Sequence, residues 1–436
     1  MNAAPAVQAS CASHDRLRKF NLAFGPILIV SLIAQVAVVW TQLDYIRGGY
    51  FDFVLYHSAA RIVRDGKGAE LYDLALQREY QKGFRPEPQT RDLPFNHLPY
   101  ELLPLLPLAD LSFTAAHAIW STLNFLLLLL TVYRLSAFVE PSQRGRSFLM
   151  LLGFFPALTA LKMGQDSILT LYLLTETFIS MKRGRYGLAG SVLALGLYKP
   201  QFVLPIAGLF LCQRCWPAVR GFILTTLGLL AVSWAIVGGK GLMGLLALWL
   251  PMIDRGNVVW PELMLNWRGL VHMTLSLIGV EPATNICTFM LSISTYVITA
   301  RFWLQDGGQS PAMFHLRFAL AVVMTSLVSF HSYSYDGTLL AIPLILMLNH
   351  FIETEQPSPE PKRIFLTLLI AIYLPLVPNI LLSEAILAWW ALPLPLFFWS
   401  IVTEFHHQSR LLGLAGENCA SPISSADSTE TPPGSY

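Results

Sequence analysis

Residues 113–134 read FTAAHAIWSTLNFLLLLLTVYR, a predominantly apolar stretch without an acidic side chain. A single α-helix needs about 20 such residues to cross the hydrocarbon core of a bilayer. Comparable stretches recur along almost the whole chain, from residue 20 to residue 403. The sequence therefore predicts an all-α polytopic membrane protein, built as a bundle of transmembrane helices.

The overall composition agrees with a membrane protein and excludes several other classes. Of the 436 residues, 54% are hydrophobic and only 13% are charged, whereas soluble domains carry roughly 25% charged residues. The formal net charge of +2 provides no basic surface for nucleic acid, so we expect no nucleic-acid partner. The five cysteines are too few and too scattered for a disulfide framework.

The apolar stretches define the expected transmembrane helices. Several are too short to cross a bilayer alone, so we expect about nine to thirteen crossings. The break at Lys199-Pro200 allows either two short helices or one kinked helix. The expected spans are 20–42, 113–134, 147–162, 166–181, 187–198, 201–212, 218–237, 284–304, 315–331, 337–351, 364–382 and 385–403.

The distribution of lysine and arginine predicts how these helices are oriented. Cytoplasmic loops of membrane proteins carry an excess of basic residues. If the cluster Arg16–Lys19 is cytoplasmic, later clusters such as Arg144–Arg146 and Lys182–Arg185 fall on the same side. We therefore expect both termini in the cytoplasm and the chain in the plasma (inner) membrane.

This orientation divides the chain into three parts. Residues 1–19 form a cytoplasmic N-terminus, residues 20–410 the transmembrane domain, and residues 411–436, rich in Ser, Thr and Pro, a disordered cytoplasmic tail. Two segments, about 43–112 and 238–283, lie outside the bilayer on the external face. Apolar pieces in the second segment are too short to span, so we expect interfacial helices there.

Polar and ionisable residues at or near membrane depth are costly and mark candidate functional sites. Here they collect on the expected external side, while the cytoplasmic loops hold mainly flanking basic clusters. This asymmetry favours a site that opens on the external leaflet, because a transporter would place its polar groups near the midplane. The candidate residues are Asp52, Tyr56, His97, Gln165, Asp166, Lys199, Arg268, His331 and Asp336.

Several of these residues have a structural alternative. Asp52 has the position of a helix N-cap as well as that of a catalytic carboxylate. Lys199 is either a snorkelling lysine or an anion-binding group at the start of a helix. An interfacial turn explains the tyrosines of 331–336, but not His331 together with Asp336. The sequence has no zinc signature and no DxD-type acidic pair, so we expect no metal and no other cofactor.

Seven short motifs follow one another along the expected external face. They are Phe51-Asp52-Phe53 with Tyr56, Phe95–Pro99, Gly164–Ser167, Ala189-Gly190, Tyr198–Gln201, Asn266–Leu270 and His331–Asp336. In this order they resemble glycosyltransferase family 87, the polyprenyl-phosphate-sugar-dependent membrane transferases, over roughly residues 45–350. At His97-Leu98-Pro99 many members have two consecutive prolines, a departure that affects a loop bend rather than a chemical group.

The resemblance implies a GT-C fold, in which the first long external loop forms the active site beside a transmembrane bundle. It also implies a donor sugar on a lipid phosphate, as in mycobacterial mannosyltransferases that extend a glycolipid. In those enzymes an aspartate of the first external loop is the general base, and Asp52 has the matching position.

The chemistry of such a transfer requires few protein groups. One base must deprotonate the acceptor hydroxyl, and cationic groups must stabilise the departing phosphate. A single base without a second nucleophilic carboxylate favours one displacement with inversion. We expect Lys199 and His331, with Arg268 as a further candidate, to approach the phosphate. We also expect removal of Lys199 to weaken donor use without affecting the fold.

The sequence thus predicts an inverting hexosyltransferase that moves a sugar, mannose favoured, from a polyprenyl-phosphate donor to a lipid or envelope-glycan acceptor. The lipid-phosphate sugar is a co-substrate, and membrane lipids are the remaining partners. The alternatives are a flippase or transporter of lipid-linked saccharides and a non-catalytic scaffold of envelope assembly. The scaffold alternative predicts that Asp52 and Lys199 are dispensable.

Overall fold

The computed structural model is built from α-helices and short 3₁₀-helices, with no β-strand among the residues that it describes. This confirms the expected all-α class. The described residues are 25–37, 39–47, 52–82, 93–139, 141, 144–255, 261–305, 310–354, 356–373 and 392–413. The expected N-terminal segment 1–19 and the tail from residue 414 lie outside these ranges.

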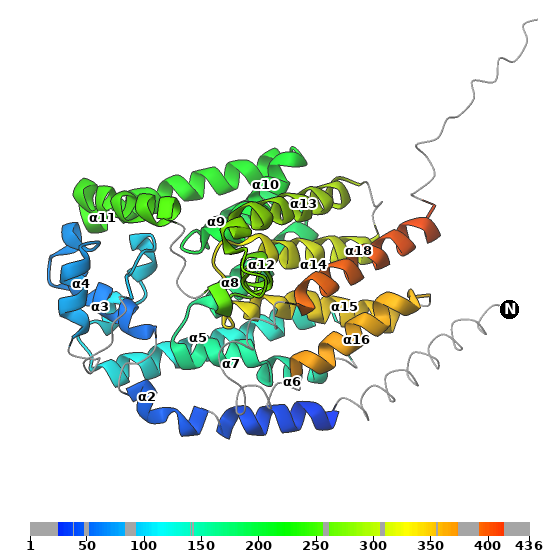
Figure 1. Cartoon of the computed structure of the whole chain (residues 1–436), viewed down its shortest axis with the longest axis horizontal. Coiled ribbons are helices and arrows are strands. Elements are labelled where there is room, and N and C mark those ends of the chain that lie inside the picture. The colour runs from blue at the N-terminus through cyan, green and yellow to red at the C-terminus, as the bar shows by residue number, and fades with distance from the viewer. Residues whose placement is uncertain are drawn as a thin grey trace, which may run out of the picture.

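The helices pack side by side into one bundle (Figure 1). A further apolar helical stretch precedes them, at residues 25–37 and 39–41. The elements are α2 (Leu43–Arg47), α3 (Phe53–Arg64), η1 (Gly68–Glu70), α4 (Leu74–Gln81), η2 (Pro99–Leu102), η3 (Leu106–Leu108), α5 (Phe113–Ser136), α6 (Arg144–Leu152), α7 (Phe155–Met163), α8 (Ser167–Lys182), α9 (Tyr186–Ala194), α10 (Pro200–Cys212), α11 (Trp216–Arg255), η5 (Pro261–Leu263), α12 (Trp267–Ser276), η6 (Glu281–Ala283), α13 (Thr284–Leu304), α14 (Pro311–Val328), η7 (Asp336–Leu340), α15 (Ala341–Glu353), α16 (Pro359–Tyr373) and α18 (Pro393–Leu411).

Four described helical stretches are long and apolar enough to cross a bilayer: Phe113–Ser136, Trp216–Leu250, Glu281–Leu304 and Asp336–Glu353. Others, such as α10, are apolar but shorter. These helices fit the expected polytopic membrane protein. The count of nine to thirteen crossings stays a prediction, because length and composition alone single out fewer helices.

The centre of the bundle is formed around α15. Residues Ala341–Ile352 of this helix are all buried, and α14, η7 and α8 pack around it. A helix that is apolar on every side is stable only inside a larger assembly. Its buried polar residues are Asn349 and His350, and His350 Nε2 lies 2.8 Å from Glu404 Oε1 of α18. This contact ties α15 to α18 within the apolar core.

Helices α9 and α11 approach closely because glycines face each other across their contact. A Cβ atom on Gly190 would lie 1.8 Å from the carbonyl oxygen of Ala218, and one on Gly221 would lie 2.1 Å from that of Gly187. Small residues allow membrane helices to pack backbone against backbone. The Ala189-Gly190 motif is therefore a packing feature of the fold.

The long segment between α2 and α5 folds into a compact helical layer at one end of the bundle (Figure 1). Its core contains Phe53, Tyr56, Tyr72 and Phe95, together with residues of α11 such as Leu245. Helix α11 reaches this layer because Gly238, at φ 66° and ψ −178°, interrupts it. The expected boundary between the span 218–237 and the external segment 238–283 thus lies at a glycine that leaves the helical conformation.

Two expected spans differ from the observed helices at prolines. The expected helix 147–162 consists of α6 and α7, because Pro156 at the start of α7 favours a new helical first turn. The break before Pro200 separates α9 from α10 as two short helices rather than one kinked helix. The expected spans 364–382 and 385–403 lie partly outside the described residues, and α18 continues to Leu411.

The basic clusters predict which ends of the helices face the cytoplasm. Two variants of a cysteine-free protein test this orientation. In one, Glu79→Cys places an exposed thiol in α4. In the other, the native Cys212 is the single cysteine, and it lies exposed at the end of α10 opposite Lys199. An impermeant thiol reagent should label Glu79→Cys in intact cells and Cys212 only after lysis. Labelling of Cys212 in intact cells, with Glu79→Cys protected, would contradict the predicted orientation.

Candidate active site

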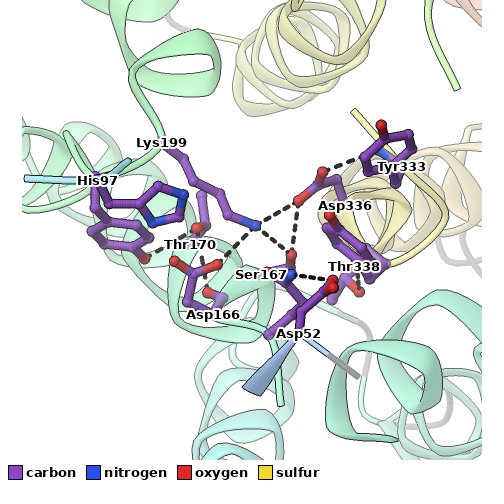
Figure 2. A network of polar contacts seen from close by, with 12 residues as sticks. Asp52, His97, Asp166, Ser167, Thr170, Lys199, Tyr333, Asp336 and Thr338 are labelled. Atoms are coloured by element: carbon purple, nitrogen blue, oxygen red, sulfur yellow. Dashed lines mark hydrogen bonds and ion pairs between the residues drawn. The ribbon is translucent and has the colours of Figure 1, made fainter. Parts of the chain in front are cut away.

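Three helix starts meet in one buried charged network. Asp166 precedes α8, Lys199 precedes α10, and Asp336 begins η7. Figure 2 shows the ammonium of Lys199 between the two carboxylates, 2.7 Å from Asp166 Oδ1 and 2.6 Å from Asp336 Oδ1. The ammonium also donates to Ser167 Oγ at 2.8 Å. Lys199 is only 4% exposed, so this is an interior ion-pair network.

The charges of this network stabilise one another. Burial lowers the pKa of Lys199, but the carboxylates of Asp166 and Asp336 outweigh it and raise this pKa above its ordinary value. Burial raises the pKa of Asp166, and the Lys199 ammonium outweighs burial there, so that the pKa is lowered. The lysine and Asp166 are therefore both charged at neutral pH.

The environment of Lys199 decides between the two interpretations of this residue. Its ammonium is buried, so the snorkelling interpretation is wrong. It binds anions at the start of a helix, but the anions are Asp166 and Asp336 of the chain itself. The ammonium donates to Ser167 Oγ and Asp336 Oδ1 and forms a further ion pair with Asp166 Oδ1. Removal of Lys199 should therefore affect the fold, contrary to the expectation from the sequence.

A glycine turn positions the residues between α7 and α8. Gly164 ends α7 with φ 69°, a conformation that favours glycine. A Cβ atom at this position would lie 2.6 Å from Phe53 Cβ, so α3 packs directly against the turn. The carbonyl oxygen of Gly164 accepts a hydrogen bond from Trp120 Nε1 at 2.9 Å. This turn directs Gln165 toward α3 and Asp166 toward Lys199.

Asp52 lies beside this turn and is held by Gln165. Gln165 Nε2 donates to Asp52 Oδ2 at 2.7 Å, and Tyr56 Oη donates to Gln165 Oε1 at 3.0 Å. The tyrosine thereby orients the amide so that its NH₂ group faces the carboxylate. Asp52 precedes α3, but its side chain makes no capping hydrogen bond. The capping interpretation of Asp52 is therefore wrong.

Glu101 is a buried carboxyl group that the sequence analysis did not identify. Its Oε2 lies 2.6 Å from His97 Nδ1, and its residue is 6% exposed. Burial raises the pKa of Glu101, and the neighbouring Asp166 carboxylate raises it further. Burial lowers the pKa of His97 to about 4, so the imidazole is neutral at pH 7. Glu101 is the only charged residue of 98–108. An ionisable residue at or near membrane depth marks a candidate site, so the sequence did contain a signal for it.

Ligand atoms of His97, Glu101 and Asp166 lie within 4.8 Å of one another, so these residues could hold a metal ion. Two features disfavour a cation there. The Lys199 ammonium already neutralises Asp166, and the raised pKa of Glu101 favours a proton over a metal bond. We interpret the group as a proton-sharing carboxyl pair with a neutral histidine, and the absence of a metal cofactor stays a prediction.

His331 and Arg268 complete the set of candidate residues. The ring of His331 packs against Tyr333 with 4.6 Å between centroids, and the Tyr333 amide donates to Asp336 Oδ2 at 3.1 Å. Burial lowers the pKa of His331 to about 4; Asp336 opposes this shift, while Lys199 and Arg268 add to it. All nine candidates thus belong to one region, linked by hydrogen bonds, ring contacts or electrostatic interactions.

Two other polar residues have structural roles. Asn266 Oδ1 accepts from the Gly269 amide at 3.0 Å and so caps α12, the helix that carries Arg268. Lys162 Nζ donates to Gln42 Oε1 at 2.8 Å. This contact lies outside the Lys199 network.

Lys199→Met keeps the length of the side chain and removes its charge. It leaves the carboxylates of Asp166 and Asp336 buried without their common cation, so we expect a loss of about 3–5 kcal/mol in the free energy of unfolding. Denaturant unfolding of the purified protein in detergent at pH 7 measures this loss.

Glu101→Gln is the matched control, because it changes a buried carboxyl of the same region whose pKa is raised by burial and by the Asp166 carboxylate. It should cost much less than Lys199→Met. Adding Asp166→Asn and Asp336→Asn to Lys199→Met should restore much of the stability. Equal losses in the lysine and glutamate variants would show that the ion pairs do not stabilise the fold.

The sequence of this region is similar to a known protein family. The model of glycosyltransferase family 87 matches residues 97–329, more than half of the chain. The match includes His97, Lys199 and Arg268, but neither Asp52 nor His331. No curated protein and no solved structure matches the chain. The extent of the family match shows that the chain belongs to glycosyltransferase family 87, and it is therefore a glycosyltransferase.

Proposed function

We propose that the protein transfers a hexose, with mannose favoured, from a polyprenyl-phosphate donor to a lipid or envelope-glycan acceptor, with inversion at the anomeric carbon. The proposed site faces the exterior of the plasma membrane. The observation that carries the proposal is the Asp52 carboxylate, which Gln165 orients at 2.7 Å beside the buried network, without a capping role.

Asp52 is the best base among the three aspartates of the site. Asp166 and Asp336 each lie within 2.7 Å of the Lys199 ammonium, and an ion-paired carboxylate is a weaker base. Asp52 accepts a hydrogen bond from the neutral amide of Gln165. It is therefore better suited to take the proton of an acceptor hydroxyl as this oxygen attacks the anomeric carbon.

The departing phosphate needs positive charge or strong hydrogen-bond donors. Lys199 is less suited than we expected from the sequence, because Asp166, Asp336 and Ser167 already engage its ammonium. Arg268 is half-buried in the first turn of α12, where the helix dipole adds partial positive charge. His331 lies within electrostatic reach of Arg268. We therefore assign the phosphate to Arg268 and His331, and to Lys199 the positioning of Asp166 and Asp336.

The stereochemistry follows from the number of suitable bases. A retaining transferase with a covalent intermediate would need a nucleophilic carboxylate in addition to the acid or base. The two other aspartates of the site are engaged by Lys199. One displacement by the activated acceptor, with inversion, is therefore the simplest route. The preference for mannose and for a polyprenyl carrier rests on resemblance to characterised members of the family.

Asp52→Asn should lower the turnover number by about 10²–10⁴-fold with little change in donor binding. The asparagine amide oxygen can still accept the hydrogen bond from Gln165, but it cannot take up the acceptor proton. Transfer from polyprenyl-phosphate mannose to a glycolipid acceptor, measured in liposomes containing the purified variant, checks this expectation.

Asp110→Asn is the matched control, because Asp110 is an exposed aspartate of the same layer, paired with Arg64 at 3.0 Å. It should retain activity close to that of the unmodified protein. An Asp52→Asn variant within a few-fold of the unmodified protein would rule out the general-base role. Movement of the lipid-linked sugar across the bilayer without transfer would instead support the flippase alternative.

A further inference from the structure

An open pocket of about 570 Å³ lies between α13 and α18, toward their C-terminal ends. In Figure 1 these ends point away from the helical layer of α3 and α4. The pocket is therefore separate from the Asp52–Lys199 site. Its volume falls within the range of roughly 300–1,000 Å³ typical of small-ligand sites.

One side of the pocket is cationic. Arg301 of α13 and Arg410 of α18 both line it, together with His406 and His407. Within the described ranges, neither arginine forms an ion pair with a carboxylate. Burial lowers the pKa of His406, and the guanidinium groups of Arg410 and Arg301 lower it further. Both guanidinium groups thus lie close enough to the His406 ring to lower its pKa, so positive charge is concentrated in the pocket.

The other side of the pocket is apolar and partly aromatic. Phe302 is 5% exposed, and its ring packs against His406 with 4.8 Å between centroids. Trp399 lines the pocket and is 59% exposed. Beyond it, Leu396 of α18 and Val297 of α13 are also exposed. An apolar surface therefore leads from the pocket along the outside of the bundle.

We propose that this pocket binds the phosphate headgroup of an anionic phospholipid. Arg301 and Arg410 contact the phosphate, since guanidinium groups bind phosphate oxygens with paired hydrogen bonds. Trp399 packs against the glycerol region, at the interfacial level that tryptophan prefers in membranes. The exposed apolar faces of α13 and α18 then accommodate the acyl chains. A soluble phosphate would use the arginines but not this apolar surface.

The proposal is tested by lipid binding to the full-length protein, measured by native mass spectrometry from detergent with phosphatidylglycerol and phosphatidylcholine. The unmodified protein should bind phosphatidylglycerol in preference to phosphatidylcholine. The double variant Arg301→Ala, Arg410→Ala should bind phosphatidylglycerol at least ~10-fold more weakly, because it loses two charge-assisted contacts. Arg220→Ala removes an exposed arginine outside the pocket and should retain the preference.

Two further variants separate lipid from soluble phosphate and guard against misfolding. Trp399→Ala should weaken phosphatidylglycerol binding. It should not change how much bound lipid added glycerol 3-phosphate displaces. Thr403→Glu adds a carboxylate to the pocket wall while both arginines remain, and it should also weaken lipid binding. Equal binding of both lipids, or an unchanged preference in the double variant and in Thr403→Glu, would overturn the proposal. Displacement of the lipid by equimolar glycerol 3-phosphate would assign the pocket to a soluble anion and also overturn it.

Discussion

The buried ammonium of Lys199, held between the carboxylates of Asp166 and Asp336, organises the site. Its partners are distant in the chain and precede or begin different helices, so one cation fixes the starts of α8, α10 and η7 relative to one another. A buried ion pair is a costly way to stabilise a core, but loss of one partner leaves a charge without compensation. The turn that carries Asp166 also carries Gln165, which orients Asp52. The position of the proposed base therefore depends on an ion pair that takes no part in proton transfer.

The helices, and the gathering of the nine candidate residues in one region, were largely predictable from the sequence, because apolar length, prolines and clustered polar residues are local signals. The pairing of the charges was not, because Lys199 and Asp336 are 137 positions apart and no local pattern relates them. Asp52 shows a second limit. An N-cap side chain reaches the first free amides from an extended backbone, but Asp52 has φ −62° and ψ −19°. Its carboxylate is therefore directed to Gln165. This direction depends on the backbone angles of Asp52, which the residue type does not reveal.

The two ends of the bundle have different chemistry, and together they suggest how the protein is placed in the membrane. At one end, a helical layer with its own apolar core covers a network of buried charges. At the other, Arg301 and Arg410 flank a pocket beside exposed apolar helix faces. In our proposals the first end receives a lipid-linked donor and the second holds a resident anionic lipid.

The central claim is that Lys199 positions the site while other groups receive the donor phosphate. It is tested most directly by a density map of the full-length protein in lipid nanodiscs with polyprenyl phosphate, the donor lipid without its sugar. The account predicts that the phosphate contacts Arg268 and His331, while Lys199 keeps both carboxylates and Asp52 faces the space next to the phosphate. A phosphate bound directly to Lys199, with Asp166 or Asp336 displaced, would contradict it.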